Sequence, residues 1–343
     1  MALRTVLTHR HMKKKLLIIT AAVLLLAAGF AAYVTLSTFH GTPTRINIPE
    51  GSSKDAVQAI IKEALPGSYG RKVAMLWALS GGRTAHGSFL VEPGSKSLNV
   101  ARKIRSGRQT PLRFTFNNVR TLQQLAAVAS RTMEFSETDF LVACDSVLPP
   151  RGYRSAAEFP AAFLPDTYEF YWTASPEYFV GKLADSRDTF WTPERRKAAA
   201  SMGLTPVEVA TIASIAEEET AAADERATVA RLYVNRLQRG MKLQADPTVK
   251  FAVGDFSLRR ITGRHLGVQS PYNTYMHEGL PPGPIRIPSA ATLRAVLTAP
   301  KHDWLYMCAK EDFSGRHNFA SDGATHMANA RRYRAALDRR GIK

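Results

Sequence analysis

Three consecutive glutamates, Glu217 to Glu219, follow an apolar segment and are the clearest candidates for chemistry in this sequence. The segment opens with Thr205-Pro206-Val207-Glu208, a capping box that predicts the start of a helix. At about 100° per residue, Ile212 and Ile215 lie on the same side of that helix as Glu219. Glu219 is therefore expected on the apolar side, where loss of water raises the pKa of a carboxyl group. Such a group can hold a proton near neutral pH and act as a general acid.

The same helical geometry separates the other two glutamates from this role. Glu218 lies off the apolar stripe, and Glu217 lies nearly opposite it. We expect both to be solvated surface carboxylates. Replacing either by glutamine should then change the stability by no more than about 0.5 kcal/mol.

Several long stretches of the sequence resemble the endolytic murein transglycosylase (MltG/YceG-like) family. They are FLPDTYEF (163–170), ASIAEEET (213–220), ERATVARLYVNRL (225–237), GMKLQADPTV (240–249), SPYNTYMHEGLPPGPI (270–285) and HNF (317–319). The resemblance implies that the catalytic glutamate is the one directly before the threonine, which is Glu219. It also implies cleavage of the MurNAc-GlcNAc bond of nascent peptidoglycan strands to give 1,6-anhydroMurNAc ends, and a role in glycan strand termination.

The resemblance also indicates residues that could bind sugar, namely Gln244, Asp246, Tyr272, Asn273, Tyr275 and His317. The amides suit N-acetyl groups and hydroxyls, and the tyrosines offer stacking faces. Asp246 could equally cap a helix, and His317 could bond a loop carbonyl. Asp246 and Glu278 are both available as a second carboxylate.

One departure from the family follows the GLPPGPI motif. The family commonly continues with Asn-Pro-Gly, whereas this chain has Ile287-Pro288-Ser289. Ser289 is predicted to cap a helix over residues 290–298. No metal-binding cluster and no phosphate-binding loop is apparent in the sequence, so no metal and no cofactor is expected.

An uncharged segment of about 20 residues, Leu16–Leu36, is long enough to span a membrane. Lys13, Lys14 and Lys15 precede it, and positive charge on that side favours a cytoplasmic N-terminus. We interpret the segment as an uncleaved single-pass anchor in the cytoplasmic membrane, with the catalytic domain on the periplasmic or extracytoplasmic side. A cleaved signal peptide is the alternative. Met1 and Met12 are both possible starts.

The composition narrows the choice of partners. The formal net charge of +17 indicates an anionic partner. Because the basic domains are expected outside the cytoplasm, we expect membrane lipid and peptidoglycan strands and no nucleic acid, and leave cell-wall synthases open. The two cysteines, Cys144 and Cys308, are interpreted as free thiols, with a disulfide as the alternative.

The predicted fold class is α+β. We divide the chain into a cytoplasmic tail (1–15), a transmembrane helix (16–36), a linker (37–44), a LysM-like subdomain (45–109), a middle region (110–200) and a mainly helical catalytic domain with a small C-terminal sheet (201–343). The 45–109 pattern of strand, two helices, strand and helix resembles a LysM-like glycan-binding module, although a packing subdomain without a ligand fits it as well. Two other functions remain open: a water-using muramidase and a non-catalytic wall-binding scaffold.

Overall fold

The computed structural model describes residues 2–82, 86–258 and 261–341. The chain forms two compact units. Unit 1 holds the residues up to Leu112 together with Glu169–Thr173, and unit 2 holds Arg113–Tyr168 and the chain from Ala174 onward. The middle region and the catalytic domain that we separated at residues 200 and 201 thus lie within one unit.

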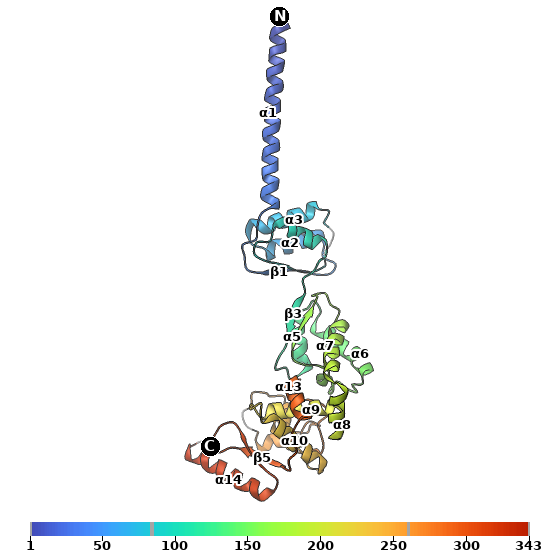
Figure 1. The fold of residues 1–343 in the computed structure, drawn as a ribbon, viewed down its shortest axis with the longest axis vertical. Helices are drawn as coiled ribbons and strands as arrows, with labels where there is room; N and C mark the ends of the chain where they lie inside the picture. The colour runs from blue at the N-terminus through green and yellow to red at the C-terminus, as the bar shows by residue number, and fades with distance from the viewer. Residues whose placement is uncertain (1, 83–85, 259–260, 342–343) are drawn as a thin grey trace. The chain divides into compact units, whose positions relative to one another are not determined.

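The N-terminal helix α1 runs from Ala2 to Thr35, so the expected tail is helical as well (Figure 1). Its part Met12–Thr35 is long and apolar enough to cross a membrane. The last turn of α1 packs on unit 1, where Val34 is buried and its carbonyl accepts a hydrogen bond from the Ser97 hydroxyl.

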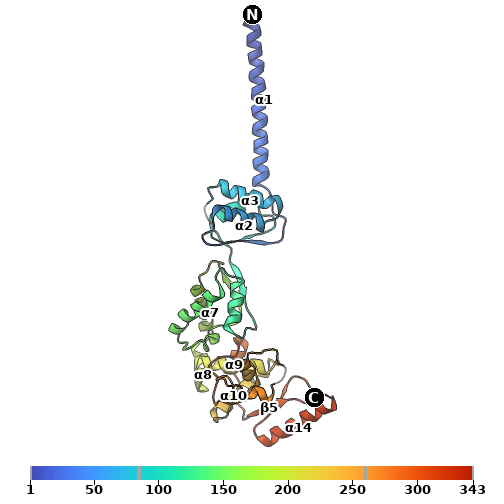
Figure 2. The same ribbon diagram turned by 180° about the vertical axis from the view of Figure 1, so that it is seen from behind.

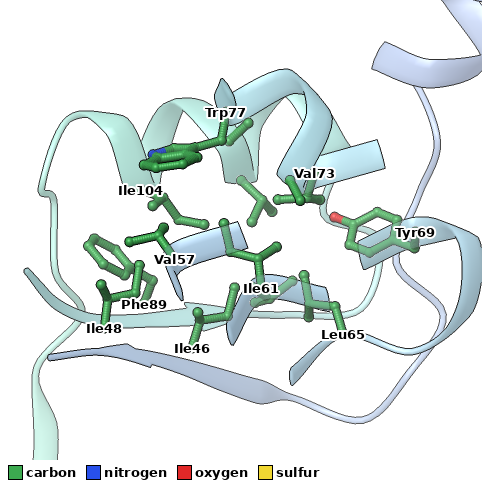
Figure 3. Packing of buried hydrophobic residues seen from close by; sticks show 14 of the residues in the cluster. Ile46, Ile48, Val57, Ile61, Leu65, Tyr69, Val73, Trp77, Phe89 and Ile104 are labelled. Atoms are coloured by element: carbon green, nitrogen blue, oxygen red, sulfur yellow. The ribbon is translucent and has the colours of Figure 1, made fainter. Parts of the chain in front are cut away.

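Unit 1 is built around one antiparallel strand pair. β1 (Thr44–Ile48) pairs with β2 (Gly87–Val91), with Ile46 opposite Phe89. The helices α2 (Lys54–Ala64) and α3 (Gly67–Leu79) lie between the strands in sequence, and α4 (Ser97–Arg105) follows them. The core side chains come from both strands and all three helices, and Trp77 is the largest of them (Figure 3).

The segment expected to be a linker, residues 37–44, contributes one residue, Phe39, to this core. Phe39 is 1% exposed, and its backbone bonds to Ser95 and Gly94. A large aromatic side chain in a segment of polar and small residues was the signal that our interpretation overlooked.

Unit 2 is mainly helical (Figures 1 and 2). Its first helices are α5 (Leu122–Ser130), α6 (Glu137–Val147), α7 (Pro176–Phe190) and α8 (Pro193–Ser201), with the short 3-10 turns η1 (Pro149–Arg151) and η2 (Phe159–Ala162). They are followed by α9 (Pro206–Glu219), α10 (Arg226–Gln238), α11 (Asp246–Val253), α12 (Gly263–Leu266), α13 (Ala290–Leu297) and α14 (Gly323–Arg339).

Two small sheets complete the fold. β3 (Leu112–Thr115) pairs with β4 (Thr167–Phe170). β5 (Tyr306–Ala309) pairs antiparallel with β6 (His317–Ala320), the small C-terminal sheet that the sequence predicted. Cys144 and Cys308 are free thiols. The α+β class is confirmed.

The helix α9 lies at the centre of unit 2, packed against α8, α10, α11 and α13. It starts with the predicted capping box, in which Thr205 and Glu208 bond each other's backbone N–H. Every residue from Val209 to Ala216 is buried. Because α9 is packed against these helices, Glu217 and Glu218 at its end are partly buried and do not lie on the solvated face that we expected.

Candidate active site

Glu219 is the last residue of α9, and Thr220 caps the helix. It lies in a cleft of about 270 Å³, together with Asp246 and Lys250. The remaining lining residues are Glu218, Pro247, Leu258 and Ile261. The Oε2 atom of Glu219 is buried and has no hydrogen-bond partner among the described residues. A buried carboxyl oxygen without a hydrogen-bond partner is costly when the group is ionised, which favours the protonated form.

Burial raises the pKa of Glu219 to about 7, and the nearby negative charge of Asp246 adds to this rise. A hydrogen bond from the Tyr233 hydroxyl opposes it. The position of Glu219 at the negative end of the α9 dipole acts in the same direction as burial. The group is therefore protonated in about half of the molecules at neutral pH, which suits a general acid.

Asp246 is the first residue of α11, and the helix is capped by Ala245, so the N-cap role considered for Asp246 is wrong. The exposed Asp246 carboxylate instead accepts a hydrogen bond of 2.7 Å from the Tyr275 hydroxyl. Burial, first, and this bond raise the pKa of Tyr275, which keeps its hydroxyl a donor. Glu278, the other candidate for a second carboxylate, is exposed and does not line the cleft.

The amides Gln244 and Asn273 shape the loops beside Asp246. Gln244 adopts a left-handed backbone with φ of 49°, and its N–H donates to the Thr274 carbonyl at 3.1 Å. Its exposed side chain accepts a bond of 3.4 Å from Arg236. The Asn273 side chain is fully buried and donates to the carbonyls of Leu266 and Val268. Asn273 thus holds the loop that presents Tyr275, and its amide is already occupied.

Tyr272 and His317 lie outside the residues that line the cleft. The Tyr272 ring packs on Phe251, with ring centroids 4.7 Å apart. His317 Nδ1 lies 3.1 Å from the buried Glu225 carboxylate, which also accepts a bond from the Thr220 hydroxyl. His317 is therefore linked to the end of α9 through Glu225, and it does not bond a loop carbonyl through its ring in this structure.

Glu217 and Glu218 are not solvated, which corrects our expectation. Their side chains are 8% and 13% exposed, and both form salt bridges with the buried Arg286. Arg286 donates to Glu218 at 2.8 Å, and Arg120 donates to the other oxygen of Glu218 at 3.0 Å. Sequence reasoning missed both arginines, because nothing local relates them to the three glutamates.

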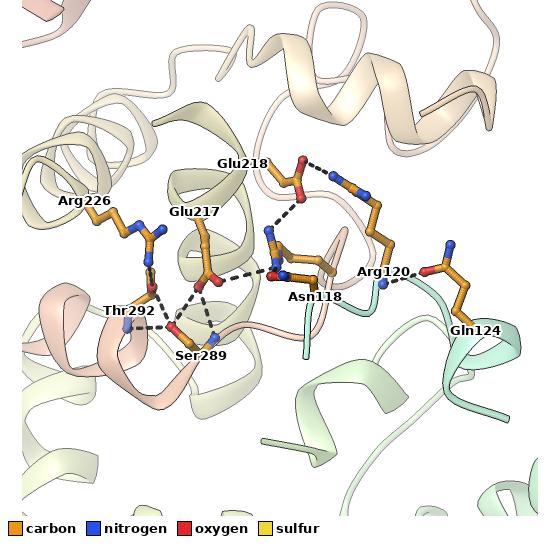
Figure 4. A network of polar contacts seen from close by, with 9 residues as sticks. Asn118, Arg120, Gln124, Glu217, Glu218, Arg226, Ser289 and Thr292 are labelled. Atoms are coloured by element: carbon orange, nitrogen blue, oxygen red, sulfur yellow. Dashed lines mark hydrogen bonds and ion pairs between the residues drawn. The ribbon is translucent and has the colours of Figure 1, made fainter. Parts of the chain in front are cut away.

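Ser289, the departure from the family pattern, completes this network. Its hydroxyl and its N–H both donate to Glu217 at 3.0 Å (Figure 4). It also caps α13 as predicted, because its hydroxyl accepts from the Thr292 N–H. Glu217 and Glu218 thus share one cation, whereas Glu219 has no salt bridge with the described residues.

The GLPPGPI motif holds the loop from Gly279 to Ile285 in place. Gly279 has a φ of 80°, which side chains other than glycine rarely adopt. A Cβ atom on Gly283 would lie 1.9 Å from the Ala157 carbonyl oxygen, so the loop needs glycine to pack there. The Ile285 N–H donates to the buried Ser214 hydroxyl of α9 at 3.0 Å. The motif is explained by close packing against α9 and the 157–158 backbone.

Comparisons with known proteins identify relatives over much of the chain. Over 301 residues the chain is 27% identical to the endolytic murein transglycosylase of Bacillus subtilis, covering 79% of this chain and 80% of that protein. It is 28% identical over 186 residues to the Streptococcus pneumoniae (strain D39) protein of the same name, covering 53% of this chain and 33% of that protein.

A solved structure of a YceG-like protein from Listeria monocytogenes has a similar fold. The TM-score is 0.57 at 23% identity, over 83% of this chain and 98% of that one. Residues 46–332 match the sequence profile of the YceG-like family. The chain therefore belongs to the YceG-like family.

Proposed function

We propose that this chain is a lytic transglycosylase that cuts peptidoglycan strands internally, with Glu219 as its acid and base. The observation that carries the proposal is the Glu219 carboxyl group, which belongs to a residue that lines the cleft and has a pKa raised by burial to about 7. The name that the relatives from Bacillus and Streptococcus carry, endolytic murein transglycosylase, supports the same activity.

In the proposed reaction, protonated Glu219 donates its proton to the oxygen that joins C1 of N-acetylmuramic acid to O4 of N-acetylglucosamine, and the C1–O4 bond breaks. The resulting carboxylate accepts the proton of the muramic acid C6 hydroxyl while O6 bonds to C1. The product carries a 1,6-anhydro end, and no water is consumed. Glu219 regains its proton, so one carboxyl group serves both steps.

Asp246 is proposed to stabilise the positive charge that develops at C1. Its carboxylate is exposed in the same cleft and is held by the Tyr275 hydroxyl. A fixed negative charge beside a developing cation lowers the barrier. Gln244, Tyr272 and His317 are proposed to bind the sugars farther along the strand, and Asn273 to hold the loop between them.

Asp246 also keeps a second function open, a muramidase that uses water. Most glycosidases use two carboxyl groups at one cleft, and the second one activates a water molecule or attacks C1. The products distinguish the two reactions. A transglycosylase releases 1,6-anhydro ends, whereas a muramidase releases reducing ends that are heavier by one water.

The test is digestion of uncrosslinked glycan strands followed by mass spectrometry of the products. Glu219→Gln should lower the rate by at least about 10²–10⁴-fold, because glutamine cannot exchange the proton. Wild type should yield anhydro ends. A Glu219→Gln variant that cuts at nearly the wild-type rate would refute the assignment.

We further propose that α1 anchors the chain in the cytoplasmic membrane, with the rest of unit 1 and unit 2 outside the cytoplasm. This would keep the cleft near nascent strands, where cleavage terminates them. Unit 1, with its β1-α2-α3-β2 order, is proposed to bind glycan in the manner of a LysM module. A reporter enzyme that works only outside the cytoplasm should be active when it is fused after the last residue. Activity there of a reporter that works only in the cytoplasm would overturn the topology.

A further inference from the structure

A second cavity in unit 2, the arginine cavity, lies at the other end of α9. Its volume is about 520 Å³, and it is lined by the start of α9 (205–208 and 211), residues 151–154 with Glu158, Arg187 of α7, Arg196 of α8, and residues 280–282 of the GLPPGPI motif. At about 1.5 Å per residue, its lining residues 205–208 and 211 lie about 12–21 Å along the helix from Glu219. It is thus separate from the cleft but built on the same helix.

Two of the four arginines in this cavity are held by acidic residues. Arg151 donates to Asp185 at 2.7 Å and to Asp188 at 3.3 Å. The buried Arg187 donates to Asp188 at 3.2 Å and to the Ala161 carbonyl at 3.1 Å. These contacts fix the two guanidinium groups and balance their charges.

The other two arginines, Arg154 and Arg196, are exposed and form no salt bridge within the described part of the chain. Two carboxylates line the cavity as well, but each already accepts a backbone N–H. Glu158 accepts from Arg154 at 2.8 Å, and Glu208 accepts from Thr205 at 2.7 Å in the capping box of α9. With Asp185 and Asp188 counted, the four arginines face four carboxylates, so the formal charges at the cavity balance. What the cavity offers a ligand is hydrogen-bond donors: the guanidinium groups of Arg154 and Arg196 have no carboxylate partner in the described part of the chain, and Arg196 donates through Nε to the Trp191 carbonyl at 3.1 Å.

Tyr153 also lines the cavity. It is 4% exposed, and its hydroxyl has no hydrogen-bond partner among the described residues. Burial raises its pKa to about 12, although Arg187, Arg151 and Arg196 are near enough to oppose the rise. A buried, neutral hydroxyl that has no hydrogen-bond partner is costly unless a bound group accepts a hydrogen bond from it.

The part of the wall that comes from the GLPPGPI motif has a restricted backbone. Pro281 and Pro282 form part of it, and Gly283 locks them against the Ala157 carbonyl by its close approach. Because the arginine cavity is held open by fixed backbone, it does not need to reorganise to admit a ligand.

We propose that the arginine cavity binds a carboxylate of the peptides that the wall glycan carries, several sugars away from the bond that Glu219 cuts. This rests on the proposed function. Guanidinium groups pair with carboxylates through two parallel hydrogen bonds, and the Tyr153 hydroxyl supplies a further donor. In peptidoglycan, the carboxyl of muramic acid is joined to the peptide, so the free carboxylates of the strand belong to the peptides. Phosphate shares this chemistry and is separated by the experiment.

The experiment measures binding of the full chain, in detergent and carrying Glu219→Gln, to uncrosslinked strands. One batch of strands keeps its peptides, and the other is stripped of them by an amidase. The double variant Arg154→Gln/Arg196→Gln should bind peptide-bearing strands about tenfold more weakly and stripped strands unchanged. Tyr153→Phe should weaken the binding of peptide-bearing strands about threefold. Lys197→Gln, an exposed cation on the same helix as Arg196 that does not line the cavity, should change neither.

Equal weakening on both kinds of strand, or no weakening by either variant, would overturn the proposal. The proposal would also be overturned if inorganic phosphate bound at the arginines while the chain bound peptide-bearing and stripped strands equally well. If the double variant does not fold, the binding of Tyr153→Phe alone decides the test, because this substitution removes only one oxygen atom. Cleavage by the wild-type chain is measured separately on stripped strands. Failure of the proposed function would appear there, without altering the comparison between the two kinds of strand.

Discussion

The pKa of Glu219 sets the pH range in which this residue can donate a proton. Its raised value of about 7 comes from burial first and from Asp246 second. Activity that depends on protonated Glu219 is therefore present below pH 7 and falls as the pH rises through about 7. Asp246→Asn removes the neighbouring negative charge, so the basic limb of kcat/KM should move to lower pH.

The measurement is the pH at which kcat/KM falls, not its maximum value, because Asp246 is also proposed to aid the chemistry. Glu278→Gln serves as the control, since Glu278 is an exposed carboxylate that does not line the cleft. A limb that stays in place in Asp246→Asn, or moves equally in Glu278→Gln, would show that the charge of Asp246 does not act on Glu219.

The buried Arg286 is expected to stabilise the end of α9 strongly. Arg286→Met leaves Glu217 and Glu218 near each other without their shared cation, which should cost about 3–5 kcal/mol of unfolding free energy. Urea denaturation measures the loss. Arg316→Met breaks an exposed pair with Asp224 and should cost less than about 1 kcal/mol. Similar small losses in both variants would mean that the buried network is held by other contacts.

Among the three glutamates, the sequence identified the candidate acid but not its neighbours. Helical periodicity and the resemblance both selected Glu219. Periodicity describes a helix by itself, so it could not show that α9 is enclosed. The cations that pair with Glu218 lie 68 and 98 residues away in the chain. Long-range ion pairs of this kind have no local signal.

At the scale of helices and strands, local signals were reliable where side chains cap backbone groups. The capping box at Thr205, the Ser289 cap and the strands near 45–48 and 87–91 were all predicted from a few adjacent residues. The helices α8 and α14 were not anticipated, although Thr192 and Asp322 cap them. Asp246 shows the limit of such signals. An Asp-Pro pair indicates that a helix begins, but it does not fix whether the Asp is the cap or, as here, the first residue of the helix.

The Gly283 contact makes a prediction about how the GLPPGPI loop is held. Gly283→Ala places a Cβ atom 1.9 Å from a backbone oxygen, so the loop must move away from Ala157. We expect a loss of more than about 3 kcal/mol in urea unfolding, in the range of severe core changes. The matched control is Gly323→Ala, where the added Cβ meets nothing within 4 Å and a helix begins. A loss of the same small size in both variants would contradict this account.

At the scale of the whole chain, each unit has its own core, and the cleft belongs entirely to unit 2. Removing residues 2–40 takes away Phe39 from the core of unit 1, a loss of about 3–5 kcal/mol for an aromatic side chain. Starting the chain at Ala31 keeps Val34, Ser37 and Phe39 in their contacts. We therefore expect the shorter chain, from Gly41, to have a weakened unit 1 and an unchanged cleft.

Hydrogen exchange by mass spectrometry can follow each unit separately in these two soluble chains. The chain from Gly41 should exchange faster than the chain from Ala31 within residues 87–105, because β2 and α4 pack on Phe39 and its neighbours. Exchange within 206–219 should be equal in both, and both should cut soluble glycan strands at the same rate. Faster exchange in α9 of the shorter chain, or loss of its cutting activity, would show that the first 40 residues support the cleft itself. Equal exchange in residues 87–105 would show that Phe39 adds little to the core of unit 1.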